Sequence, residues 1–210
     1  MKPFLLSLLV LGSAAGSLPA ATLLQRTGDT TFQCCSFVAV ALSWTQADTW
    51  SGVQIDLELI NNDGSGAVSA GSAYLTTSLG PGTTEALHEI DETIVSTKIA
   101  GRQTFTLFTG LTLGPGTYHL IYSPSSTNDL LVAFSGLLPA VYGEGVSGEA
   151  WSIDDVEAPY PPASTYQLWE PPSMLVSITG TREPAPIPEP ATFGAFAVGL
   201  AFLAWRRASC

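Results

Sequence analysis

The sequence has 210 residues and a formal net charge of −11, because 18 acidic residues stand against seven lysines and arginines. All 18 acids but only four of the basic residues lie between Thr22 and Pro190, so this middle part carries 4 − 18 = −14. Such an acidic surface repels phosphate backbones and excludes nucleic acid as a partner. Charged residues make up only 12% of the chain, and glycine and proline are abundant, as is typical of a secreted β-rich protein.

Residues 1–21 have the three parts of a Sec-type signal peptide. Lys2 gives a positive start, an apolar run extends to Leu11, and small residues follow as far as Ala21. This order predicts export through the Sec translocon and removal of the segment by signal peptidase near Ala20 or Ala21. No cysteine lies in the cleavage zone, which argues against a lipoprotein. The alternative is that the segment is a core strand or an N-terminal anchor.

Residues 22–181 are predicted to form one all-β domain, an antiparallel β-sandwich of jelly-roll-like type. The clearest strand, 53–60, alternates apolar residues with Gln54, Asp56 and Glu58, so one face should be buried and the other wetted. Other runs rich in β-branched and aromatic residues predict strands at 37–44, 72–78, 93–99, 103–108, 116–122, 130–134, 149–153, 165–168 and 173–179. Short strands separated by Gly/Pro turns, without a long helical period, favour a sandwich.

Two local features interrupt this pattern. Residues 85–93 can form one helical turn at most. Residues 111–120 join an apolar run to an aromatic strand through Gly114, Pro115 and Gly116, which predicts a hairpin-like connection. This segment is similar to the L-x-L-x-x-G-T-Y pattern of sandwich domains that carry interchangeable surface anchors.

Few residues suggest chemistry. Cys34 and Cys35 are adjacent, so in an oxidising compartment they form a strained vicinal disulfide, pair with another chain or stay free as structural thiols. His88 and His119 lie far apart in the sequence and match no metal-ligand spacing. No nucleophile elbow accompanies them. We therefore predict no catalytic residues, no metal site and no cofactor, and we read His119 as a structural histidine.

Two oxygen-rich loops could in principle attract calcium. One contains Asp154, Asp155 and Glu157, and the other is Asn61–Asp63. Neither has the pattern of an EF-hand or of a calcium-binding repeat, so solvated acidic turns are the simpler interpretation.

Four tryptophans in the middle part leave a binding function open. Exposed aromatic side chains on a β-sandwich can stack on sugar rings, whereas tryptophan in a core is the more common arrangement. The residues concerned are Trp44, Trp50, Trp151 and Trp169.

The C-terminal segment has a distinct organisation. Prolines at every second position from 184 to 190 predict an extended stalk over residues 182–190. Residues 191–205 are uncharged and would form a helix of about 22 Å, short for a bilayer core of about 30 Å. Arg206 and Arg207 then provide a basic stop, and their side chains can reach the membrane interface. Residues 191–210 are thus predicted to be a short transmembrane helix with a basic tail. The alternative is a buried core helix.

Pro188, Glu189 and Pro190, followed by a short apolar helix and terminal arginines, resemble a PEP-CTERM sorting signal. The resemblance implies recognition by exosortase, a membrane-embedded protease-transpeptidase of Gram-negative bacteria that make exopolysaccharide. Pro188, Glu189 and Pro190 would be the recognition motif, and Arg206 and Arg207 the cytoplasmic stop. We therefore expect a non-enzymatic protein that is anchored transiently in the membrane and then delivered to the cell surface or the exopolysaccharide matrix. The alternatives are a carbohydrate-binding module and, less favoured, a secreted hydrolase.

Overall fold

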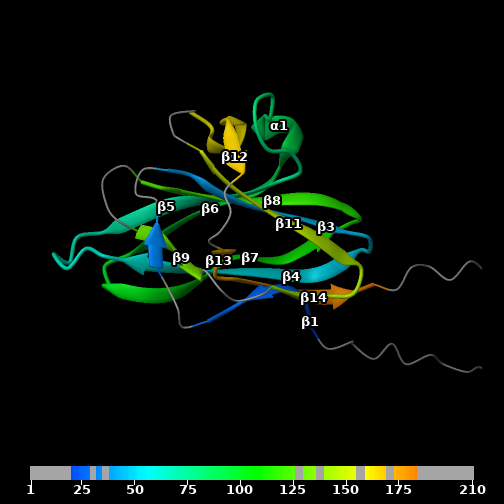
Figure 1. Cartoon of the computed structure of the whole chain (residues 1–210), viewed down its shortest axis with the longest axis horizontal. Helices are drawn as coiled ribbons and strands as arrows, with labels where there is room; N and C mark the ends of the chain where they lie inside the picture. The colour runs from blue at the N-terminus through cyan, green and yellow to red at the C-terminus, as the bar shows by residue number, and fades with distance from the viewer. Residues whose placement is uncertain are drawn as a thin grey trace, which may run out of the picture.

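The computed structural model describes residues 20–28, 32–34, 38–125, 130–135, 140–154, 159–168 and 173–183, with the side chains of 32–34, 135, 148–154 and 173 excepted. These residues form two stacked antiparallel sheets, shown in Figure 1. The prediction of an all-β sandwich is confirmed. The N-terminal segment 1–19 and the tail 184–210 lie outside the described residues, so the predictions made for them remain predictions.

The first sheet has eight strands in the described part of the chain. Six of them follow the order β10 (Val141–Tyr142), β1 (Ala21–Arg26), β14 (Val176–Arg182), β4 (Trp50–Asn61), β9 (Leu130–Ser135) and β13 (Ser173–Met174). The other two branch from this order: β2 (Phe32–Cys34) pairs with β9, and β7 (Gly101–Leu113) pairs with β4.

The second sheet has six described strands. Their order is β12 (Tyr166–Leu168), β11 (Val146–Asp154), β3 (Val40–Gln46), β8 (Gly116–Pro124), β5 (Ser69–Thr76) and β6 (Glu89–Thr97). A helical turn, α1 (Glu85–His88), and a 3-10 turn, η1 (Pro161–Ala163), complete the structure. In Figure 1, α1 lies above the second sheet, on the side away from the first sheet, and β12 forms one edge of the second sheet.

The hydrophobic core fills the space between the sheets. The alternation predicted for β4 is confirmed, because Val53, Ile55, Leu57 and Leu59 are all fully buried. Side chains from both sheets meet there, and the largest fully buried ones are Trp44, Trp50, Tyr122 and Phe134. A second, smaller cluster, which includes Ala41, Tyr74 and Ile121, packs with Tyr160 and Tyr166.

Several element bounds differ from the predictions. Strand β1 was not predicted, because Leu23 and Leu24 are both buried across a register shift and so break the alternation. Strand β7 continues to Leu113, beyond the predicted 103–108. The predicted strand 173–179 is two strands, and β14 ends at Arg182, one residue into the predicted stalk. The helical turn at Glu85–His88 agrees with the limit of one turn.

The predicted hairpin at residues 111–120 is wrong. Strand β7 pairs with β4 in the first sheet, whereas β8 pairs with β3 and β5 in the second, so the turn carries the chain between layers. Side-chain contacts hold the crossing in place. The Tyr118 hydroxyl donates to the Gly114 carbonyl at 2.8 Å, and the Gln46 amide donates to the Leu113 carbonyl at 3.0 Å. Gly/Pro turns of this kind serve inter-sheet connections as well as hairpins, and sequence pattern alone does not separate the two.

Candidate functional site at the root of the C-terminal tail

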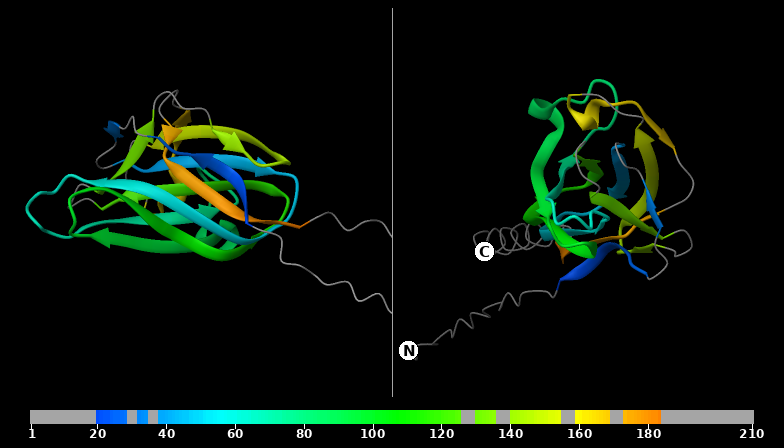
Figure 2. Two further views of the ribbon diagram at one scale, coloured as in Figure 1. Left: turned by 90° about the horizontal axis from the view of Figure 1, so that it is seen from below. Right: turned by 90° about the vertical axis from the view of Figure 1, so that its left-hand side faces the viewer.

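Strand β14 is the last strand before the tail, and it lies inside the first sheet. It pairs with β1 on one side and β4 on the other. Ala21 at the start of β1 is opposite Gly180 near the end of β14. The first and last described strands therefore begin and end side by side, as the adjacent blue and orange strands in Figure 2 show. Both the N-terminal segment and the tail are joined to the same end of the sandwich.

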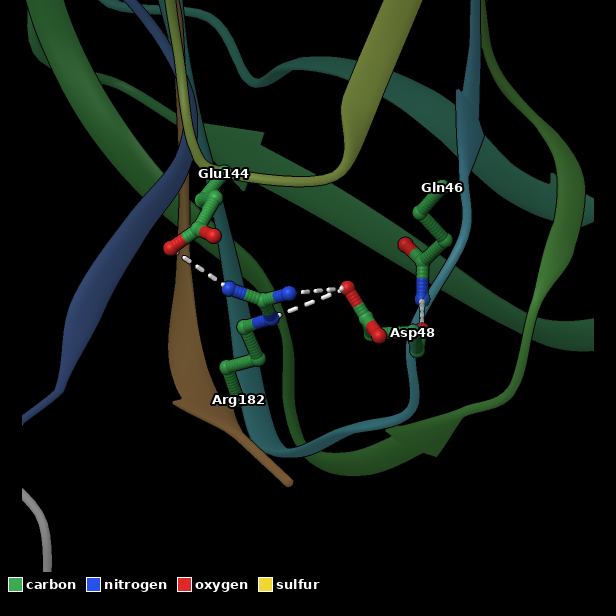
Figure 3. Close-up of polar contacts among 4 residues, drawn as sticks. All are labelled: Gln46, Asp48, Glu144 and Arg182. Atoms are coloured by element: carbon green, nitrogen blue, oxygen red, sulfur yellow. Dashed lines mark hydrogen bonds and ion pairs between the residues drawn. The ribbon is translucent and has the colours of Figure 1, made fainter. Parts of the chain in front are cut away.

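Arg182 fixes the end of β14 by ionic contacts, shown in Figure 3. Its Nε donates to Asp48 Oδ2 at 2.9 Å, and a terminal guanidinium nitrogen lies 2.8 Å from the same oxygen. The other terminal nitrogen is 2.7 Å from Glu144 Oε2. Asp48 is 16% exposed and Glu144 is 84% exposed, so the contact with Asp48 is the better shielded of the two. We call these three residues the Arg182 clamp.

The turn that presents Asp48 is itself held by Gln46. This side chain is buried, and its amide donates to the carbonyls of Asp48 at 3.1 Å and Gly114 at 3.0 Å. Its oxygen accepts the Trp44 indole N–H at 3.1 Å. The turn that carries Glu144 approaches closely as well, because a Cβ on Gly145 would overlap the Asp48 carboxylate. A larger residue there would displace that carboxylate, and the φ of +78° at Gly145 is also one that other residues avoid.

The clamp lies at the end of β14. Directly after Arg182, the Glu183 N–H donates to the Thr49 carbonyl at 2.8 Å, and Glu183 is the last residue described. Pro188 is six residues beyond Arg182, which at full extension is at most about 22 Å. An enzyme that acts near Pro188 must therefore work close to the base of the sandwich. The clamp consists of paired charges, and these contacts fix the position of the strand end.

Sequence reasoning missed this site. It assigned Arg182 to the stalk, and it had no reason to connect Arg182 with Asp48 or Glu144, which are distant in the sequence. One signal was available: Arg182 is one of only four basic residues in the acidic middle part. An isolated cation in such a region has many carboxylates to pair with.

The two histidines, His88 and His119, have different surroundings and different hydrogen-bond partners. The His119 ring Nδ1 lies 2.6 Å from the Ser43 hydroxyl, and these residues are directly opposite each other in the β3–β8 register. Burial, not a neighbouring charge, lowers the pKa of His119. His88 is at the end of α1 and accepts the Thr84 N–H at 3.1 Å. The Ser43–His119 contact follows from strand pairing, and a catalytic triad would also need a carboxylate on the imidazole.

The tryptophans relevant to sugar binding are only partly described. Trp44 and Trp50 are 1% and 2% exposed, so neither can stack on a sugar at the surface. The side chain of Trp151 and all of Trp169 lie outside the described residues. Two of the four aromatic residues that motivated a carbohydrate-binding module are thus core residues.

Some residues of the predicted disulfide and of the two oxygen-rich loops lie among the described residues, and others do not. Cys34 ends β2, but its side chain and all of Cys35 are outside the described part, so their disulfide stays a prediction. Asn61 uses its side-chain oxygen to accept the Asp63 N–H and the Ser69 hydroxyl, both at 2.8 Å. That loop is therefore held by its own oxygen atoms. Asp154 ends β11, whereas Asp155 and Glu157 are outside the described residues.

Within the described ranges, no three or more histidine, cysteine, aspartate or glutamate residues group in a way that could hold a metal ion. Over the same ranges, no helix is long and apolar enough to cross a bilayer. The predicted span, 191–210, lies outside those ranges.

Comparison with protein families decides the nature of the tail. The model of the PEP-CTERM protein-sorting motif matches residues 186–208. The chain carries a PEP-CTERM sorting motif. The matched range begins three residues after Glu183 and includes Pro188, Glu189, Pro190, Arg206 and Arg207. The motif implies processing by exosortase, a membrane protein. No curated protein and no solved structure matches the chain.

Proposed function

We propose that this chain is a non-enzymatic surface protein whose acidic sandwich is the cargo of a PEP-CTERM sorting pathway. The Sec translocon exports it, and signal peptidase removes residues 1–21. The short apolar helix in 191–210 then retains it in the inner membrane of a Gram-negative bacterium. Exosortase acts near Pro188, Glu189 and Pro190, and the sandwich passes to the cell surface or the exopolysaccharide matrix.

The match of the sorting motif to residues 186–208, which begins three residues after the last described residue of the sandwich, carries this proposal. The order of parts is what a sorted protein requires, because the recognition segment must be accessible while the domain stays folded. The clamp supports that order, since it holds β14 in the sheet up to Arg182. The adjacency of β1 and β14 supports it too, since both membrane-directed segments then leave from one end of the cargo.

The acidity of the domain supports an extracellular matrix role. A charge of −14 over residues 22–190 keeps the protein soluble and attracts cations or basic partners. Divalent cations could bridge such a surface to acidic polysaccharide. The burial of Trp44 and Trp50 makes direct stacking on sugars a weaker alternative.

Fractionation of the host tests the proposal. The protein should appear in the outer-surface or matrix fraction of cells that contain exosortase, and it should accumulate in the inner membrane of cells that lack it. A version truncated after Glu183 is the matched control, because it keeps the whole described domain but loses the motif. If this version reaches the surface as efficiently as the full chain, the sorting proposal fails.

A further inference from the structure

The last three described residues, 181–183, are attached to the sandwich by polar contacts. Earlier in β14, Val176 and Ile178 are 1% and 0% exposed and anchor the strand in the core. The register of β14 with β4 then shifts between Thr179 and Thr181, and none of residues 181–183 is buried. Segments with few buried apolar contacts open locally at low cost. The end of β14 can therefore fray as far as the register shift while the core stays closed.

Arg182 makes the strongest contacts that oppose this fraying. Two nitrogens of its guanidinium group contact one Asp48 oxygen, at 2.9 and 2.8 Å. Neutral hydrogen bonds to β4 and its preceding turn add to them, among them a bond to the Thr49 carbonyl at 2.8 Å and a long one from the Ser51 hydroxyl at 3.5 Å. Charge-assisted hydrogen bonds are roughly twice as strong as neutral ones. Loss of Arg182 should thus loosen residues 181–183 more than loss of any one neutral contact.

Little chain separates this strand end from the sorting motif. Residues 184 and 185 alone lie between Glu183 and the matched range 186–208. Pro188 is five residues beyond Glu183, a distance of about 16 Å in the predicted extended stalk. A helix with its side chains is about 10–12 Å across. The gap between the sandwich and the motif therefore admits about one layer of a membrane enzyme.

We propose, on the basis of the sorting function proposed above, that Arg182 is a positioning residue for removal of the tail. By holding residues 181–183 in the sheet, it fixes the distance between the sandwich and the motif. Loss of two stalk residues reduces this distance to about 9 Å, which is less than the width of a helix. Release of residues 181–183 adds about 9 Å and restores room for the enzyme. In a shortened chain, loss of Arg182 therefore helps removal of the tail.

The rate of tail removal in the host tests this proposal, measured by pulse-chase labelling of the full chain in cells that contain exosortase. Deletion of residues 184 and 185 leaves the matched range intact and should slow removal about tenfold or more, because a site that the linker cannot reach has almost no effective concentration. Adding Arg182→Gln to the deletion should accelerate removal about 5- to 30-fold, up to the wild-type rate, because loss of the clamp raises the frayed fraction by about that factor. Arg182→Gln without the deletion should leave the rate unchanged.

Two control variants of the shortened chain separate reach from general loss of stability. Gly71→Ala lies in β5 of the second sheet, where a Cβ would overlap the Tyr122 phenol, so it destabilises the core and leaves the contacts of β14 in place. Glu144→Gln removes the exposed contact of Arg182 and keeps those with Asp48. Neither variant should restore removal of the tail.

The proposal is overturned if the shortened chain loses its tail at the wild-type rate, or if Arg182→Gln fails to accelerate removal in it. It is also overturned if Gly71→Ala accelerates removal equally, or if Arg182→Gln slows removal in the chain of normal length. A wild-type chain that keeps its tail whether or not exosortase is present would contradict the sorting function itself, and the role of Arg182 with it.

Discussion

The contribution of the Arg182 clamp to the stability of the domain can be measured directly. Replacing Arg182 with glutamine removes two charge-assisted contacts to one Asp48 oxygen and one contact to Glu144. Asp48 is mostly buried, whereas Arg182 is one-third exposed and Glu144 is largely exposed. Hydrogen bonds to charged groups contribute about 1.5–3 kcal/mol and exposed ion pairs about 0.2–1 kcal/mol. Because solvent screens part of the contact, the expected loss of unfolding free energy is about 1–2 kcal/mol.

Urea unfolding followed by tryptophan fluorescence measures this loss, since Trp44 and Trp50 are buried reporters of the core. Asp48→Asn should cost about as much as Arg182→Gln, and the double variant should cost little more than either, with a coupling of about 1 kcal/mol. Glu144→Gln should stay within about 0.5 kcal/mol of the wild type. Fully additive losses, or an equal loss from Glu144→Gln, would refute the reasoning.

Three further outcomes are expected. Gly71→Ala should lower the free energy of unfolding by about 1–3 kcal/mol, because a Cβ would overlap the buried Tyr122 phenol, whereas Gly64→Ala, with open space around it, should unfold like the wild type. Burial lowers the pKa of His119, so the unfolded chain takes up the proton first, and stability should fall as the pH drops below about 6.5. His119→Gln should reduce the difference in unfolding free energy between about pH 7.5 and about pH 5, measured by urea titration on either side of the ordinary histidine pKa. If this difference is the same as in the wild type, His119 is not the group responsible for the pH dependence. In cells that contain exosortase, the Glu189→Gln variant should keep its tail, which immunoblots detect as a longer chain. Normal removal of the tail would show that exosortase does not recognise this carboxylate.

The sequence could predict the parts of the fold that follow a simple period. Strand β4 alternates without a break over its core residues, and its buried face was read directly. Strands β1 and β7 were missed or shortened for one physical reason, since each contains adjacent buried residues at a register shift. Leu23 and Leu24 in β1 and Leu107 and Phe108 in β7 both interrupt the alternation. A bulge of this kind is set by pairing with a distant strand and is hidden from local pattern.

The candidate site was less predictable than the motif next to it. The sorting motif is a continuous segment with a fixed order of residue types, so the sequence alone was sufficient to recognise it. The clamp joins Asp48, Glu144 and Arg182, which only sheet topology brings together. The pairing of β7 with β4 depends on topology as well, because a strand's neighbours are long-range properties of the fold.

The central claim is that the tail is a removable sorting signal. Intact mass and C-terminal sequencing of the protein from its host, with exosortase present and with its gene deleted, test this claim most directly. The C-terminus should lie near Pro188, Glu189 and Pro190 when the enzyme is present, and the chain should continue to Cys210 when it is absent. The same C-terminus in both strains would contradict it.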